Sequence, residues 1–343
     1  MLKGGDKMGQ IWEKHIHDKL EELDKIILPK YREESKKRIE EEDIDYALYE
    51  KEFKRRIKKA IKILTPITNE ATKTLFFYRG KGVMPLLKPD EKLRLILIHQ
   101  LFGKSNRNMS YMLMLFSLMT GVDVSYKYVE RLYSDPETEA ALFNLLILLL
   151  KKKNIKEIDC CGDATGYSLI ISKHYLSEVN KLKDKIKEQD PKDDKKAFVY
   201  NFALMDISTR MYVCYGTSFI SEKKAFEKAM DMLGVLDISI RSIRLDRYYS
   251  NPCDVKRFPD SKVYIIPKIN AGLGHGDEWL NTMKSFVEDT WNYLKEYFQR
   301  VNIENAWAQD KKVLGWKVAQ KRLDRIDTAL FCRCIWHDLF YLF

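Results

Sequence analysis

The stretch 155–172, IKEIDCCGDATGYSLIIS, marks a change in the hydrophobic period of the chain. Before it, apolar residues recur mostly at helical spacing, whereas here apolar and polar residues alternate, which is typical of a β-strand or a pair of strands. Asp163 lies inside this stretch, and a carboxylate in a buried strand is costly unless it is paired or binds a metal. The stretch therefore predicts the first strand of a sheet, with a functional acid on it.

The segments after this strand predict a mixed sheet. In chain order we expect strands at 196–207 and 210–219 joined as a hairpin, a helix at 221–233, strands at 240–246 and 262–268, and helix after that. The charged run 181–196 predicts a solvated loop. Three strands in a meander, followed by helix, strand, helical turn, strand and helix, is the element order of a ribonuclease H-like domain. The predicted fold class is thus α/β, with a mixed sheet and helices on both of its faces.

Two acids are expected to meet in this sheet. Asp246 closes the strand 240–246, which in a ribonuclease H-like sheet lies beside the first strand, so Asp163 and Asp246 should converge. Glu304, on a later helix, can supply a third carboxylate, and such oxygen ligands suit two Mg²⁺ ions. Asp159 lies four residues before Asp163 and would face the same way on a straight strand, unless a bulge at Gly162 intervenes. The residues alone leave open which of the two is the first acid.

The stretch 297–311, YFQRVNIENAWAQDK, places four polar side chains at steps of 3, 4 and 7 residues. They are Tyr297, Arg300, Glu304 and Lys311. On a helix that turns by roughly 100° per residue, they lie within an arc of about 60°. One carboxylate flanked by two cations and a phenol suits a phosphate-rich ligand. An amphipathic surface helix with a chance charge pattern is the alternative interpretation.

These four residues form a Y-x2-R-x3-E-x6-K pattern that resembles the signature of a large group of prokaryotic insertion-sequence DDE transposases. Two further segments, DATGYS (163–168) and LDRYYS (245–250), resemble the segments around the first and second catalytic Asp of that family. The resemblance covers roughly residues 91–343, and the composition adds a hint of an archaeal or thermophilic source. The four-residue signature is its most specific part.

The resemblance implies roles for the matched residues. Asp163, Asp246 and Glu304 would be the catalytic acids and would hold two Mg²⁺ ions, for which Mn²⁺ could substitute. The D-x-T-G match selects Asp163 over Asp159 as the first acid. Three further residues would bind DNA: Arg300 and Lys311 through phosphates, and Tyr297 by contacting or orienting the backbone.

The residues before the sheet predict helices. We divide the chain into a helical amino-terminal region with a basic linker (1–90), a helix-turn-helix region (91–150) and a ribonuclease H-like catalytic domain (151–343). Pro29 and Pro66 are expected to break the first helices. In the second region Gly121 suits a helix end and Ser125 suits the N-cap of a short helix.

That short helix carries side chains that reach phosphates and bases, which favours DNA binding over a purely structural helical hairpin. Its predicted DNA-binding residues are Tyr126, Lys127 and Arg131.

Composition and charge agree with an intracellular DNA-binding protein. Among 343 residues, 60 Lys and Arg outnumber 50 Asp and Glu, which gives a net charge of +10 and suits a polyanionic partner. The six Cys form no C-x-x-C pair, so reduced thiols are expected. The most apolar run, 141–150, is too short to span a membrane, and the first residues lack the apolar core of a signal peptide. We expect a cytoplasmic, nucleoid-associated protein without a membrane partner.

The leading hypothesis is a transposase that binds the terminal repeats of its element as double-stranded DNA, cuts the ends and joins them to a target. A homodimer or higher oligomer on DNA is expected. Two alternatives are open: a transposase-derived DNA-binding protein without cleavage, and a ribonuclease H-like nuclease without strand transfer. The sequence does not give the repeat, the target site or the excision route.

Overall fold

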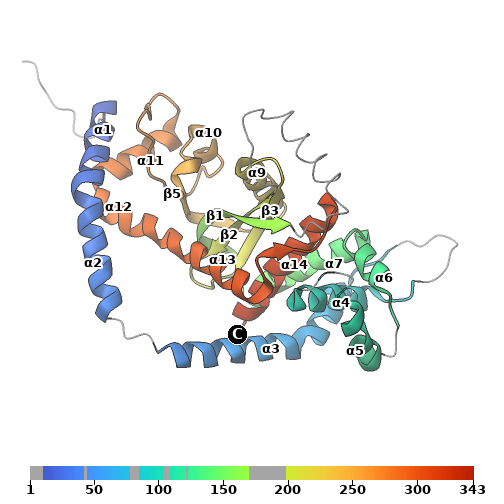
Figure 1. The fold of residues 1–343 in the computed structure, drawn as a ribbon. Helices are drawn as coiled ribbons and strands as arrows, with labels where there is room; N and C mark the ends of the chain where they lie inside the picture. Colours follow the sequence, from blue (N-terminus) through green and yellow to red (C-terminus); the bar gives the residue numbers. More distant parts are fainter. Residues whose placement is uncertain are drawn as a thin grey trace, which may run out of the picture.

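The computed structural model describes residues 11–41, 45–77, 85–103, 105, 108–120, 123–169 and 198–343. Within them the chain forms one six-stranded mixed sheet surrounded by helices, so the predicted α/β class is confirmed (Figure 1). The expected loop at 181–196 and the expected helix end at Gly121 lie outside the described residues.

The elements follow the predicted order. The first helices are α1 (Glu13–Glu22), the π-helix η1 (Leu23–Ile27), α2 (Leu28–Glu41), α3 (Tyr46–Thr72), α4 (Pro89–Phe102), α5 (Ser110–Thr120), α6 (Tyr126–Leu132) and α7 (Pro136–Lys152). The sheet region holds β1 (Glu157–Leu169), β2 (Phe198–Asp206), β3 (Tyr212–Ser218), α9 (Glu222–Leu233), β4 (Ser239–Leu245), η3 (Arg247–Tyr249), α10 (Pro252–Val255) and β5 (Lys262–Tyr264). The chain continues with α11 (Asp277–Glu288), α12 (Thr290–Tyr297), η4 (Phe298–Arg300), α13 (Val301–Leu314), β6 (Lys317–Val318) and α14 (Leu323–Tyr341).

The strands lie in the order β3-β2-β1-β4-β5, with β6 paired to the end of β1. The strands β1, β2 and β3 form an antiparallel meander, and β4 lies parallel to β1, as expected for the two strands that carry acids. The predicted strand 262–268 is wrong in length, because β5 ends at Tyr264. The buried Tyr293 hydroxyl accepts a hydrogen bond from the Ile265 backbone N–H at 2.7 Å, which occupies that donor at the edge of the sheet.

Helices cover both faces of the sheet. On β3, Gly216 faces α9 so closely that an added Cβ would lie 2.1 Å from the Ala225 carbonyl oxygen, so this position requires glycine. The neighbouring Tyr215 points to the opposite face, because side chains alternate along a strand, and there it stacks on Phe331 of α14 with ring centroids 4.5 Å apart. The sheet is therefore enclosed between α9 and the carboxyl-terminal helix.

The amino-terminal helices pack onto this body. The helix α3 contacts α4, α7 and α14, and α1 contacts α11. The predicted breaks at Pro29 and Pro66 are wrong: the π-helix η1 leads directly into α2, and α3 continues through Pro66. Around Pro66 the buried Leu64 and Ile67 keep the helix in place, and this packing outweighs the one backbone hydrogen bond that proline removes. In the described part of the chain, no helix is both long and apolar enough to cross a bilayer.

Candidate active site

Three carboxylates from separate parts of the chain meet beside the carboxyl end of β4. Gly162 of β1 pairs with Leu245 of β4, so Asp163 and Asp246 follow at neighbouring positions on two parallel strands. Asp246 also caps the turn η3, since its carboxylate accepts a hydrogen bond from the Tyr248 N–H at 2.8 Å. Glu304 projects from the first turn of α13. The expected convergence of the acids is present.

The three acids meet around the guanidinium of Arg300. Its Nη1 lies 3.1 Å from Asp163 Oδ2, and its Nη2 lies 3.5 Å from Asp246 Oδ2 and 2.7 Å from Glu304 Oε1. The Arg300 side chain is only 16% exposed, and its Nε is buried without a hydrogen-bond partner. The sequence pattern placed Arg300 beside Glu304 but gave no sign that it faces the two aspartates.

The donor set suits a hard cation. Burial raises the pKa of the Asp163 carboxyl to about 6, although Arg300 opposes this, and the charges of Asp246 and Glu304 raise it further. A cation among the carboxylates stabilises their ionised forms, and here the guanidinium supplies that charge. In this arrangement no three Asp, Glu, His or Cys side chains of the described residues are close enough to hold a metal ion. The carboxylates fit Mg²⁺ by chemistry, but the Arg300 guanidinium occupies the place among them that the ion would take.

Lys311 lies beside the acids on the same face of β1. Its ammonium group donates a hydrogen bond to the hydroxyl of Thr165, which is two residues after Asp163 and so points the same way. The ammonium also lies 5.2 Å from the ring centre of Trp316, whose side chain is 61% exposed. Burial lowers the pKa of Lys311. The pattern of charges did not reveal Thr165 or Trp316 as neighbours of this site.

Tyr297 is not placed to contact a ligand from solvent. It ends α12, is 5% exposed, and its ring centre lies 6.0 Å from the Arg300 guanidinium. The next residue, Phe298, stacks on Tyr31 of α2 with ring centroids 4.3 Å apart. In this arrangement Tyr297 packs beside Arg300, and its expected role of contacting or orienting the DNA backbone stays a prediction. The contact from Tyr31 was not foreseen, because nothing in the first ninety residues suggested it.

Asp159 does not join the acids. Its carboxylate pairs with Arg241 and accepts a hydrogen bond from Ser242 on β4. The register shift in β1 falls between Ile158 and Asp159, and not at Gly162. Gly162 is instead required by packing, since an added Cβ would lie within 3 Å of three apolar side chains. The structure thus places Asp163, and not Asp159, beside Asp246.

The three residues expected to read DNA lie on α6, away from the acids (Figure 1). Ser125 caps this helix as predicted, with its hydroxyl 3.2 Å from the Tyr128 N–H. Lys127 and Arg131 are exposed, whereas Tyr126 is half-buried against the core. Two cations on this short helix are therefore accessible to a phosphate backbone.

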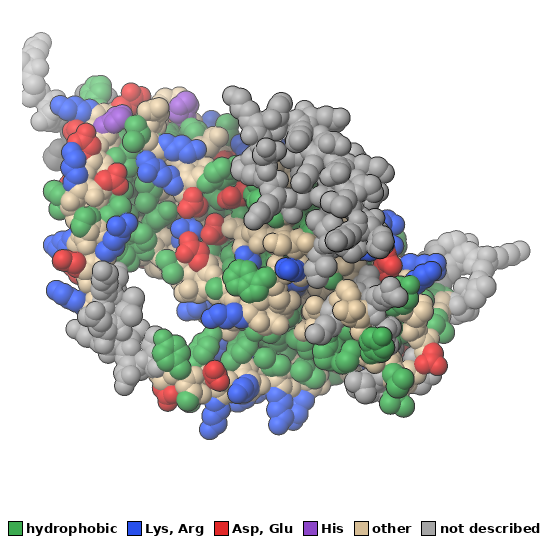
Figure 2. Space-filling model, viewed as in Figure 1, with side chains coloured by type: hydrophobic (Ala, Val, Ile, Leu, Met, Phe, Trp, Pro, Cys, Tyr) green, Lys and Arg blue, Asp and Glu red, His purple; other side chains and the backbone are tan. Residues whose placement is uncertain are grey.

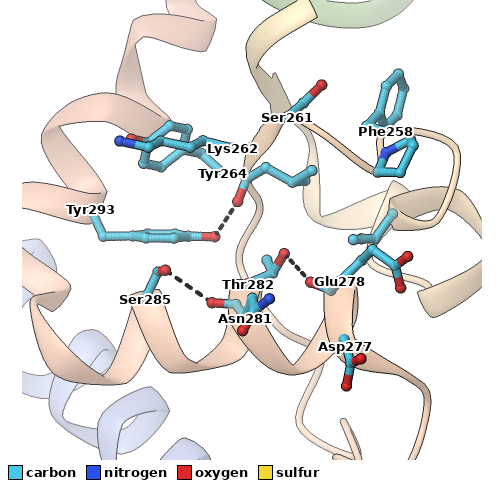
Figure 3. A pocket seen from close by; sticks show the side chains of 13 residues that line it. Phe258, Ser261, Lys262, Tyr264, Asp277, Glu278, Asn281, Thr282, Ser285 and Tyr293 are labelled. Atoms are coloured by element: carbon cyan, nitrogen blue, oxygen red, sulfur yellow. Dashed lines mark hydrogen bonds between the residues drawn. The ribbon is translucent and has the colours of Figure 1, made fainter.

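A separate cavity of about 420 Å³ lies between β5 and α11 (Figure 3). The side chains of Tyr264 and Tyr293 approach it from one side, and Asp277 and Glu278 from the other. None of the three converging acids lines it. The cavity is thus distinct from the candidate active site.

Comparison with known proteins gives one informative relative. No family model matches the chain. The chain is 38% identical over 329 residues to a protein of the archaeon Archaeoglobus fulgidus described as "Probable transposase for insertion sequence element ISA1214". The match covers 95% of each chain and so includes the amino-terminal helices as well as the sheet.

Proposed function

Because the chain belongs to the insertion-sequence transposases, we propose that it is a DDE transposase that binds the terminal inverted repeats of its element and cleaves and joins DNA. The main support for the proposal is that Asp163, Asp246 and Glu304 converge around the guanidinium of Arg300. Three carboxylates brought together from two strand segments and a helix repel one another, and such a cluster with a raised pKa at Asp163 is typical of a functional site.

The sheet supports a ribonuclease H-like catalytic domain. An antiparallel meander followed by two parallel strands, with helices on both faces, agrees with the element order expected for that fold. The first acid lies on β1 and the second directly follows β4, so the topology itself brings them to neighbouring positions. Fold alone does not establish an activity, and the site residues carry the functional argument.

In this proposal Asp163, Asp246 and Glu304 hold two Mg²⁺ ions, for which Mn²⁺ substitutes. Ions bound there would supply the activation of the attacking oxygen and the stabilisation of the leaving oxygen at phosphorus. The carboxylates then no longer need Arg300, whose planar guanidinium is free to hold a phosphate in a bidentate manner. Lys311, fixed by Thr165, supplies a second positive charge along the same face of β1.

End recognition is assigned to α6 as the last helix of a helix-turn-helix. Its exposed Lys127 and Arg131 contact phosphates or base edges of the DNA. The half-buried Tyr126 packs the helix against the core and offers its hydroxyl to the DNA. The partner is double-stranded DNA at the element ends and at the target, bound by a homodimer or higher oligomer. The protein acts in the cytoplasm on the nucleoid.

In the test, the protein is incubated with a labelled element-end duplex, a supercoiled target plasmid and Mg²⁺, and release and joining of the labelled end are measured. Wild-type protein should release the end and join it to the plasmid. Asp246→Asn should abolish both products, whereas Asp231→Asn, a matched change at an exposed acid of α9, should leave both unchanged. Cutting without joining would identify a nuclease, and binding without cutting would identify a DNA-binding derivative; either outcome contradicts the proposal.

A further inference from the structure

Positive charge is concentrated in the middle of α3. Residues 51–62 contain seven Lys and Arg and one acid, Glu52, so this short segment carries six of the ten net charges of the chain. The preceding helices are also highly charged but balanced, since residues 13–41 contain eight Lys and Arg against nine acids. The excess on α3 is thus local and does not reflect a generally basic surface.

Six of these cations form one continuous surface, which we call the α3 basic stripe. It consists of Lys51, Lys54, Arg55, Lys58, Lys59 and Lys62, all of them exposed. At roughly 100° per residue they fall within an arc of about 140°. The opposite side of the helix holds the buried Ala60 and Leu64 and packs on the body of the protein. Figure 2 shows the resulting Lys and Arg side chains projecting outward along α3, at the lower edge of the view.

The stripe is only partly neutralised. Arg55 pairs with Glu52 at 2.6 Å and Lys54 lies 3.7 Å from Glu50, both at exposed positions where such pairs contribute little. Within the described part of the chain, Lys58 and Lys62 have no acidic partner. Like charges four residues apart, as at Lys54, Lys58 and Lys62, destabilise a helix by a few tenths of a kcal/mol per pair. A polyanion on this surface relieves that repulsion.

Duplex DNA fits the stripe better than an anionic membrane does. A helix that binds at a membrane surface inserts its apolar face between the lipids, but the apolar face of α3 is already buried against α4, α7 and α14. Among residues 51–62 only Ile61 is both apolar and exposed. The stripe runs for about 16 Å, and duplex DNA carries about one phosphate charge per 1.7 Å of its axis.

We propose that the α3 basic stripe is a second duplex-binding surface, independent of DNA sequence, that holds DNA other than the segment at the acids. The stripe lies on the side of α3 opposite the face that packs on α4, α7 and α14, and it is separate from the cluster formed by Asp163, Asp246 and Glu304. The inference rests on the proposed function, because it assigns a second surface for the DNA that a transposase binds.

The experiment compares two triple variants of the full chain. Lys54→Gln, Lys58→Gln and Lys62→Gln together remove three stripe charges. The matched control removes three exposed lysines from the balanced helices: Lys14→Gln, Lys25→Gln and Lys37→Gln. Binding to a 30-base-pair duplex of random sequence is followed by fluorescence anisotropy between 50 and 200 mM NaCl, with Ca²⁺ in place of Mg²⁺.

The stripe variant should bind the random duplex at least about tenfold more weakly than wild type, with a salt slope shallower by about three. The control should change binding less than about twofold. A Lys→Arg triple at the same stripe positions should keep wild-type affinity, which separates charge from folding. Equal binding by the stripe variant and the control would overturn the inference. So would loss of binding to phosphatidylserine vesicles with DNA binding intact.

The result is separable from the proposed function. At saturating element-end DNA, the stripe variant should still cleave at the wild-type rate, because its acids are unchanged. If wild-type protein binds random duplex through the stripe but never cleaves, the proposed activity fails while the stripe assignment stands.

Discussion

Arg300 provides a test of the site that needs no DNA. Arg300→Met keeps most of the side-chain volume but leaves three carboxylates without their shared cation. Two effects should follow in the purified protein. The variant should be less stable than wild type without divalent cations, and it should gain more stability from them, because the guanidinium no longer competes for the carboxylates.

The magnitude follows from the geometry. Breaking a fully buried ion pair costs about 3–5 kcal/mol, because one charge is left without compensation. Arg300 and Asp163 are each 16% exposed, but Asp246 and Glu304 are 36% and 46% exposed, so water screens two of the three pairs. We expect the free energy of unfolding to fall by about 2–4 kcal/mol. A cation at about 100 times its Kd restores about 2.7 kcal/mol.

The measurement is thermal and urea unfolding with EDTA and with increasing Ca²⁺ or Mg²⁺. The matched control is Arg241→Met, since Arg241 pairs with Asp159 and Glu157 outside the site. Arg241→Met should lose little stability and should respond to cations as wild type does. The reasoning fails if Arg300→Met is as stable as wild type in EDTA, or if cations stabilise the variant and wild type equally.

Three further outcomes are expected. Burial raises the pKa of Asp163 from 3.8 to about 6, so its contribution to stability is full below pH 3.8 and is lost as the pH rises through 6. Between about pH 4 and 6.5, wild type should therefore lose free energy of unfolding relative to Asp163→Asn in metal-free thermal melts. Asp310→Asn leaves the buried His337 ring without the carboxylate 2.8 Å from its Nδ1, which should lower the free energy of unfolding by about 3–5 kcal/mol in urea titrations. Replacing Lys127 and Arg131 by Ala should weaken binding to element ends and make the salt slope shallower by about one per lost phosphate contact, as measured by gel shift.

Much of the fold follows from local patterns and one topological rule. Alternation predicted β1, two segments joined as a hairpin predicted β2 and β3, and the short apolar run before Asp246 predicted β4. The hydroxyl of Ser125 made the start of α6 visible in the sequence, since few residues cap a helix so well. The expectation that the strand before Asp246 lies beside the first strand of a ribonuclease H-like sheet brought Asp163 and Asp246 together.

What the sequence did not reveal depends on contacts between distant segments. Helical spacing predicted that Tyr297, Arg300 and Glu304 share a face, and Glu304 was expected to meet the two aspartates. The spacing did not predict that Tyr297 is buried or that Arg300 lies among the three carboxylates. Pro66 predicted a helix end from local geometry, but the packing of α3 on three other helices overrides that preference.

If Asp163, Asp246 and Glu304 hold the metal ions that cleave DNA, removing the charge of one acid should stop cleavage and spare binding. Glu304→Gln keeps size and helix propensity and removes only the charge that a hard cation requires. Cleavage of labelled element-end DNA is measured with Mg²⁺ or Mn²⁺, beside a gel shift with Ca²⁺. Glu304→Gln should bind the DNA at least as tightly as wild type and lose cleavage by several orders of magnitude. Cleavage at a near wild-type rate would show that these acids do not hold a catalytic metal.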